Sequence, residues 1–293
     1  MVASVMRPSA PERRLKALTP EAAASYRRDG VLFPIRVVSE AQALELRRHL
    51  ESHEARTGGP IAGSMRHKSH LLFTWLWDLV HAPTLLDAVE DVLGPNLLCW
   101  STNFFIKEAG DGKFVSWHQD STYWGLSEPD VVTAWVALSP ATVENGAMRM
   151  IPGSHGEQVK HRDTYSKDNL LTRGQEIEVD VDESRAVSVV LRPGEMSLHH
   201  VRIVHGSEPN RSNDRRIGLA IRYVPTYVRQ LVARETATLV RGVDEYRNFD
   251  PETGPEFDLS PQALAQHKAI TERQAQILYA GTKTKSFDKV VPG

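Results

Sequence analysis

Apolar residues recur at helical spacing in the first third of the chain. The tripeptide Thr-Pro-Glu at 19–21 predicts a helix start, because threonine caps a first turn and proline suits the first helical position. The pair Asp-Gly at 29–30 should end that helix, and the run VLFPIRVV that follows predicts a short strand. Ser39, with Gln42 three residues later, matches a capping box and predicts a second helix that continues to about Glu54.

From Asn96 onward, short apolar and aromatic runs alternate with turn residues as far as Pro225. Strands of this length with regular turn signals predict a sandwich or barrel, and helices followed by strands make the chain α+β, mainly β. The run MSLHHVRIVH, at 196–205, is expected to be one such strand. Before these runs, 71–93 predicts two helical pieces that are broken at Pro83.

The whole chain, 1–293, is expected to form a single domain, since mainly-β domains of this size are common. The expected parts are a flexible arm at 1–15, a mostly helical flank at 19–93, a strand-rich core at 96–225, and a C-terminal loop and helix at 226–293. The long polar stretch 156–182 inside the core is expected to be functional or mobile, because unstructured connections of that length are uncommon.

Composition narrows the classes of partner and compartment. Hydrophobic residues make up 41% of the chain and charged residues 25%, and the net charge of −2 favours neither nucleic acid nor an anionic membrane as a partner. Cys99 is the one cysteine, so no intrachain disulfide can form, which favours a reducing compartment. No apolar run approaches the roughly 20 residues that cross a bilayer, and the first residues lack an apolar signal core. We expect a cytoplasmic protein, and the sequence leaves its oligomeric state open.

The string WHQD at 117–120 carries the strongest chemical signal. On an extended segment, side chains at i and i+2 point the same way, so His118 and Asp120 can reach one ion. Two histidines and one carboxylate are the ligand set of non-heme Fe(II) oxygenases. The second histidine could come from 199–205, which holds three, and alternation along one strand would place His199 and His205 on the same face.

Three longer strings share a family pattern: NFFIKEAGDGKFVSWHQDSTYW, ENGAMRMIPGSH and HGSEPNRS. Together they resemble the phytanoyl-CoA dioxygenase family of Fe(II)- and 2-oxoglutarate-dependent oxygenases, from about Thr19 to about Pro225. The resemblance implies a double-stranded β-helix (a jelly-roll, cupin-like core) with flanking helices. It also implies that His118, Asp120 and His205 bind the metal, because His205 precedes Gly-Ser as the family's distal ligand does. His199 and His200 are then expected to pack in the strand with satisfied ring nitrogens.

The same resemblance implies residues that contact 2-oxoglutarate. Arg216 lies eleven residues after the distal histidine, where the family has an arginine, and its guanidinium fork matches a carboxylate. Strand alternation should turn the neighbouring Arg215 to the opposite face. Ser207 and Trp135 match further contact positions, and Asn103 matches another when the Gly-Pro-Asn at 94–96 is aligned with the family.

The resemblance therefore implies a hydroxylase that uses Fe(II), 2-oxoglutarate and O2 on a small-molecule metabolite and releases succinate and CO2. A halogenating member would have Ala or Gly in place of Asp120, so the aspartate disfavours that alternative. A non-catalytic scaffold is disfavoured because His118, Asp120, His205 and Arg216 are all present. A metal-dependent hydrolase is disfavoured because Arg216 would have no role in it. Elsewhere, Lys68 and His70 could cover the mouth of the cosubstrate site, but a solvated basic stretch is the favoured expectation. Tyr123 and Trp124 are expected to line a substrate pocket or to pack in the core.

Overall fold

The computed structural model describes residues 14–166, 168–171, 173–280 and 287. Most of the expected flexible arm lies outside these residues, and the chain is anchored from Lys16, where three successive backbone N–H groups donate to the Asp91 carboxylate. The helices are α1 (Pro20–Asp29), α2 (Glu40–Thr57), α3 (Thr74–Val80), α4 (Pro83–Leu93) and α5 (Pro261–Leu278), with short 3-10 turns η1 (Gly63–Arg66), η2 (Ser69–Leu71), η3 (Asp120–Tyr123), η4 (Ser154–Gly156) and η5 (Glu183–Arg185). No helix among the described residues is long and apolar enough to span a membrane.

The helix signals in the sequence are confirmed. Thr19 Oγ1 accepts the Ala22 N–H at 3.2 Å, and Gly30 ends α1 with a φ of 73°. Ser39 and Gln42 form the capping box of α2, which runs to Thr57, three residues beyond the expected end.

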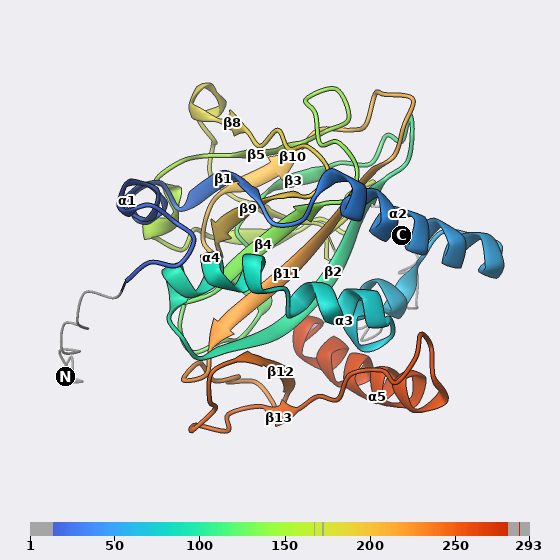
Figure 1. The fold of residues 1–293 in the computed structure, drawn as a ribbon. Coiled ribbons are helices and arrows are strands. Elements are labelled where there is room, and N and C mark those ends of the chain that lie inside the picture. The colour runs from blue at the N-terminus through green and yellow to red at the C-terminus, as the bar shows by residue number, and fades with distance from the viewer. Residues whose placement is uncertain (1–13, 167, 172, 281–286, 288–293) are drawn as a thin grey trace.

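Two facing sheets form the core of the molecule (Figure 1). The larger has the order β1-β9-β4-β11-β2-β12-β13 and the smaller the order β3-β10-β5-β8, and these two facing sheets have the arrangement of a double-stranded β-helix. The strands are β1 (Val31–Arg36), β2 (Leu97–Lys107), β3 (Val115–His118), β4 (Val132–Ala137), β5 (Met148–Met150), β6 (His161–Asp163), β7 (Gln175–Ile177), β8 (Val187–Ser188), β9 (Glu195–His200), β10 (His205–Ser207), β11 (Arg216–Pro225), β12 (Thr236–Arg241) and β13 (Asp250–Pro251).

Alternation along the central strands separates an apolar face from a polar one. In β11, Ile217, Leu219 and Ile221 join the core beneath α3 and α4, which lie across that face of the sheet in Figure 1. The intervening Arg216 and Arg222 point into the space between the two sheets, where they line cavities. The polar face of the larger sheet is therefore one wall of an internal site.

The run 196–205 is not one strand, contrary to expectation. It divides into β9, which pairs in the larger sheet, and β10, which pairs in the smaller one. Between them the chain turns, with the Ile203 N–H donating to His200 O and Gln119 Nε2 donating to Arg202 O. The larger sheet also includes β1, β12 and β13, three strands outside the expected core of 96–225.

Candidate metal and cosubstrate site

Three ligand side chains converge between the sheets. His118 ends β3, Asp120 begins η3, and His205 begins β10 directly opposite His118 in the antiparallel register. One ligand atom from each lies within 4.8 Å of the others, and all three residues are buried. His118 Nε2 is 3.4 Å from Asp120 Oδ1. The break between β9 and β10 thus carries the chain from the larger sheet to the strand that supplies the third ligand.

Backbone hydrogen bonds fix how the two histidines present their rings. His118 Nδ1 donates to Ser116 O at 2.9 Å, and His205 Nδ1 donates to Ile203 O at 3.0 Å. A carbonyl only accepts, so each Nδ1 carries the proton and each Nε2 keeps its lone pair for a metal. Second hydrogen bonds of this kind are usual for metal-bound histidine. The donor set and its orientation fit Fe(II).

Charge in the site also suits a cation. Burial lowers the pKa of His205 well below its usual value, so this ring is neutral near pH 7. Burial by itself raises the pKa of Asp120, but the adjacent His118 ring and the positive charge of Arg222 outweigh it and hold that pKa below its usual value. A neutral imidazole and an anionic carboxylate are the protonation states in which these groups bind metals.

A cavity of about 30 Å³ adjoins the three ligands and contains three of the predicted cosubstrate contacts: Arg216, Ser207 and Trp135. Arg216 is 1% exposed, its Nη1 donates to Gly146 O, and its Cζ lies 5.4 Å from the centre of the Trp135 ring. Burial lowers the pKa of Arg216 only to about 10, so it stays charged. No carboxylate in the described part of the chain pairs with it.

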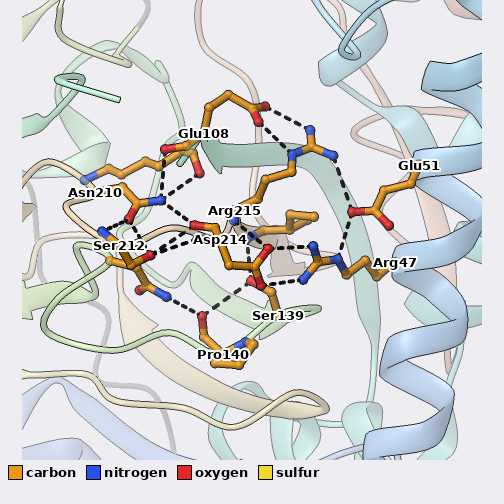
Figure 2. Close-up of polar contacts among 12 residues, drawn as sticks. Arg47, Glu51, Glu108, Ser139, Pro140, Asn210, Ser212, Asp214 and Arg215 are labelled. Atoms are coloured by element: carbon orange, nitrogen blue, oxygen red, sulfur yellow. Dashed lines mark hydrogen bonds and ion pairs between the residues drawn. The ribbon is translucent and has the colours of Figure 1, made fainter. Parts of the chain in front are cut away.

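Arg215 points away from this cavity, as alternation predicted. It pairs with Glu54 at 2.7 Å and with Glu108 at 2.8 Å on the outer side of the sheet. Figure 2 shows Arg215 with Glu108 and Glu51, together with the neighbouring ion pair of Arg47 and Asp214, which ties α2 to the start of β11. The two adjacent arginines therefore have different surroundings, and only Arg216 lacks an acidic partner among the described residues.

Lys107, which was not predicted from the sequence as a site residue, is fully buried beside this cavity. Its Nζ donates to Ser207 Oγ at 2.7 Å and also to Glu208 O. Burial and the nearby charge of Arg216 lower the pKa of Lys107 to about 6. Alternation along β2 places Lys107 on the same face as Asn103, so the pattern contained this signal.

Asn103 lies in a different place from the other predicted contacts. It lines a second, larger cavity of about 210 Å³, which shares Asp120, Phe105 and Arg222 with the smaller one. Trp124 also lines the larger cavity, which agrees with the first of its two expected positions, the wall of a pocket. Tyr123 instead donates its hydroxyl to Asp163 at 2.6 Å.

The expectation that His199 packs with satisfied ring nitrogens is wrong. His199 lines the smaller cavity, its ring centre is 5.3 Å from that of His205, and its Nδ1 has no partner among the described residues. Burial lowers its pKa to about 4. Because β9 and β10 belong to facing sheets, both histidines point inward from opposite walls.

Lys68 and His70 are not solvated, again contrary to expectation. Both are fully buried, Lys68 Nζ forms an ion pair with Glu252 at 2.5 Å, and His70 Nε2 lies 3.4 Å from the same carboxylate. The acid that accounts for their burial lies 184 residues away from Lys68 in sequence, where no local pattern reveals it.

Comparison with known proteins gives consistent similarities. The family described as Phytanoyl-CoA dioxygenase (PhyH) matches residues 26–218. The chain is 32% identical over 157 residues to a probable alpha-ketoglutarate-dependent hypophosphite dioxygenase of Stutzerimonas stutzeri, a match that covers 53% of this chain and only about half (54%) of that one. It is 28% identical to the L-proline trans-4-hydroxylase of Streptomyces griseoviridis, over 69% of this chain and 85% of that one.

Solved structures extend the similarity to the fold. The apo form of ThoJ, a non-heme monooxygenase, is 35% identical and superposes with a TM-score of 0.79 over 88% of this chain and 97% of its own. CytC3 with Fe(II) and alpha-ketoglutarate is 25% identical, with a TM-score of 0.63 over 84% of this chain and 98% of its own.

Proposed function

The chain belongs to the phytanoyl-CoA dioxygenase family of Fe(II)- and 2-oxoglutarate-dependent oxygenases, and we propose that it hydroxylates a small-molecule metabolite with release of succinate and CO2. One observation carries the proposal: a buried His-Asp-His cluster and a buried, acid-free arginine line the same cavity. A structural role for the cluster would leave the charge of Arg216 without a function.

Each residue of the site has a proposed role. His118, Asp120 and His205 hold the iron, each histidine through its free Nε2. Arg216 binds the far carboxylate of 2-oxoglutarate through its guanidinium fork, and Ser207 offers a hydroxyl to the same group. Trp135 forms the wall beside them, and the buried lining keeps bulk water from the reacting atoms.

When bound, iron and 2-oxoglutarate supply the oxidising chemistry, in which one atom of O2 enters succinate and the other the substrate. The protein orients the cosubstrate and holds the substrate's C–H bond near the metal. The two relatives named for hypophosphite and L-proline act, by their names, on small molecules, and the cavity of about 210 Å³ beside Asp120 has room for a molecule of that size.

Asp120 also distinguishes this proposal from the halogenating alternative. A carboxylate in this position occupies the coordination site that a halide would need, so hydroxylation is the favoured outcome. The test is succinate formation from 2-oxoglutarate with Fe(II) and O2, compared between the wild type and Asp120→Ala. Succinate from the wild type alone supports the proposal, while equal rates from both proteins, or a chlorinated product in chloride buffer, contradict it.

A further inference from the structure

The larger cavity, of about 210 Å³, borders the metal cluster through Asp120 and has a cation in its wall. Arg222 is 8% exposed, and no hydrogen bond or ion pair joins its guanidinium to any described residue. Its Cζ lies over the ring of Trp124, 4.9 Å from the centre, and 6.0 Å from that of Phe105. Aromatic faces stabilise such a cation only in part, so an isolated buried guanidinium is costly without an anion.

Asp120 does not remain available as that anion. It is the one acid among the described residues that line the larger cavity, and the proposed function assigns it to the metal. Iron(II) and the 2-oxoglutarate dianion cancel in charge, and Asp120 then balances Arg216. The charge of Arg222 is left without a counterpart, and the partly buried Arg66 in the same wall adds a second positive charge.

Three amide side chains in the wall of this cavity have unused oxygen atoms. Asn103 Oδ1, Gln175 Oε1 and Gln274 Oε1 are buried without partners in the described chain. Gln274 Nε2 donates to Glu235 Oε1 at 3.1 Å, which fixes its amide with the oxygen free. Buried amide oxygens without a donor are unfavourable, so they indicate a ligand that brings N–H or O–H groups.

From these contacts we infer that the substrate is a small oxyanion: a molecule whose carboxylate or phosphorus oxyacid group binds Arg222, and whose N–H or O–H donors face the amides. The inference rests on the proposed function and names the substrate class of that site. A volume of about 210 Å³ lies below the roughly 300–1,000 Å³ of typical ligand pockets and suits a molecule of amino-acid size. Arg222 holds the anionic end next to Asp120, which places neighbouring C–H bonds near the metal.

The test uses anaerobic full-length protein loaded with Fe(II) and 2-oxoglutarate. The probes are the twenty common L-amino acids, each paired with its α-carboxamide, together with acetate, hypophosphite and phosphate. Binding is followed as a change in the Fe(II)–2-oxoglutarate charge-transfer absorbance and as a shift in the melting temperature. The amino acids and acetate test for a carboxylate substrate, and hypophosphite and phosphate test for a phosphorus oxyacid.

We expect at least one carboxylate or phosphorus oxyanion probe to bind the wild type, and the α-carboxamide, where the probe has one, to bind at least about tenfold more weakly because it lacks the carboxylate. Arg222→Met, which keeps the volume but removes the fork, should weaken the anion by at least about tenfold, a much larger loss than any in 2-oxoglutarate affinity, because Arg216 still binds the cosubstrate. Arg222→Lys should lie between them, because it keeps the charge without the bidentate geometry. Arg202→Met, at a partly buried arginine that lines neither cavity, is the matched control and should bind as the wild type does.

Several results would overturn the inference. They are binding by carboxamides only, by no probe, or by an oxyanion with equal affinity for the wild type and Arg222→Met. Loss of 2-oxoglutarate binding in Arg222→Met would assign Arg222 to the cosubstrate instead. If Arg222→Met does not fold, two comparisons still test the inference. They are the affinity of Arg222→Lys against that of the wild type, and the affinity of the wild type for each amino acid against that for its carboxamide. A wild type that binds neither Fe(II) nor 2-oxoglutarate would overturn the proposed function itself, which separates the two failures.

Discussion

At the scale of single residues, neighbouring side chains of one type have opposite roles. Arg215 and Arg216 are adjacent, yet one pairs with Glu54 and Glu108 outside the sheet and the other is buried by the metal cluster. The difference follows from the two-residue period of β11, which could be predicted from sequence. The surroundings of His199 could not be predicted in the same way. The prediction took 196–205 as a single strand, whereas the chain turns after His200.

Arg216→Ala should raise the 2-oxoglutarate concentration required while iron binding survives. Loss of a buried charge partner costs about 3–5 kcal/mol, or roughly two to four decades in affinity. Arg216→Lys should recover part of this, since charge is kept and the fork is lost. Titration of the iron-loaded protein by charge-transfer absorbance measures the effect, with Arg215→Ala as the control that should bind 2-oxoglutarate normally. A large loss in Arg215→Ala and none in Arg216→Ala would reverse the assignment.

Lys107 predicts a pH dependence of stability in the metal-free protein. Burial lowers its pKa to about 6, whereas in the unfolded chain it stays near the ordinary 10.5. Between these values the unfolded chain binds the extra proton, so stability relative to Lys107→Met should rise with pH through this window. Below pH 6 the difference between the two proteins should be constant. Urea unfolding of both from pH 5 to pH 10 measures it, and parallel curves throughout would show that Lys107 keeps its proton when folded.

At the scale of elements, local signals predicted the helices and missed the sheet order. The caps at Thr19 and Ser39 act within four residues, so the sequence shows them directly. The pairing of β1 with β9 and of β12 with β2 joins segments more than a hundred residues apart, and no periodicity reports such pairs. The central strands and the edge strand β1 were visible as apolar runs, but β12 and β13 at the other edge of the larger sheet were not.

The close contact of β11 and β4 predicts that Gly218 cannot be enlarged. A Cβ at Gly218 would lie 1.8 Å from Cζ2 of Trp135, so Gly218→Ala must displace that ring from its place beside Arg216. Overpacking of this kind costs about 1–3 kcal/mol. Urea unfolding should show that loss, and 2-oxoglutarate titration a weaker affinity. Gly112→Ala, with no atom within 4 Å of the added Cβ, is the matched control, and equal behaviour of the two variants would contradict the packing argument.

At the scale of the whole molecule, a buried ion pair joins the C-terminal part to the sheet. Lys68, at the start of η2, pairs with Glu252 just beyond β13, and Thr236 Oγ1 of β12 donates to the same carboxylate at 2.6 Å. The charged form persists despite burial, because Lys68 and His70 lower the pKa of Glu252 to about 2. This contact fixes β12 and β13 on the edge of the larger sheet.

Lys68→Met should therefore destabilise the protein by about 3–5 kcal/mol, since it leaves Glu252 charged and unpaired in the interior. Adding Glu252→Gln should restore much of the loss, because the uncompensated charge is removed. Chemical denaturation of the two single variants and the double variant gives the coupling energy. Additive losses would mean that the two groups do not act as a pair.

The site joins segments that are far apart in sequence, and metal binding by His205 tests it most directly. The measurement is an anaerobic titration with Fe(II) in the presence of 2-oxoglutarate, followed by the charge-transfer absorbance of the wild type, His205→Ala and His199→Ala. We predict one iron per chain for the wild type and His199→Ala, and loss of iron binding in His205→Ala. Retention of the absorbance in His205→Ala, with its loss in His199→Ala, would contradict the metal centre proposed from His118, Asp120 and His205.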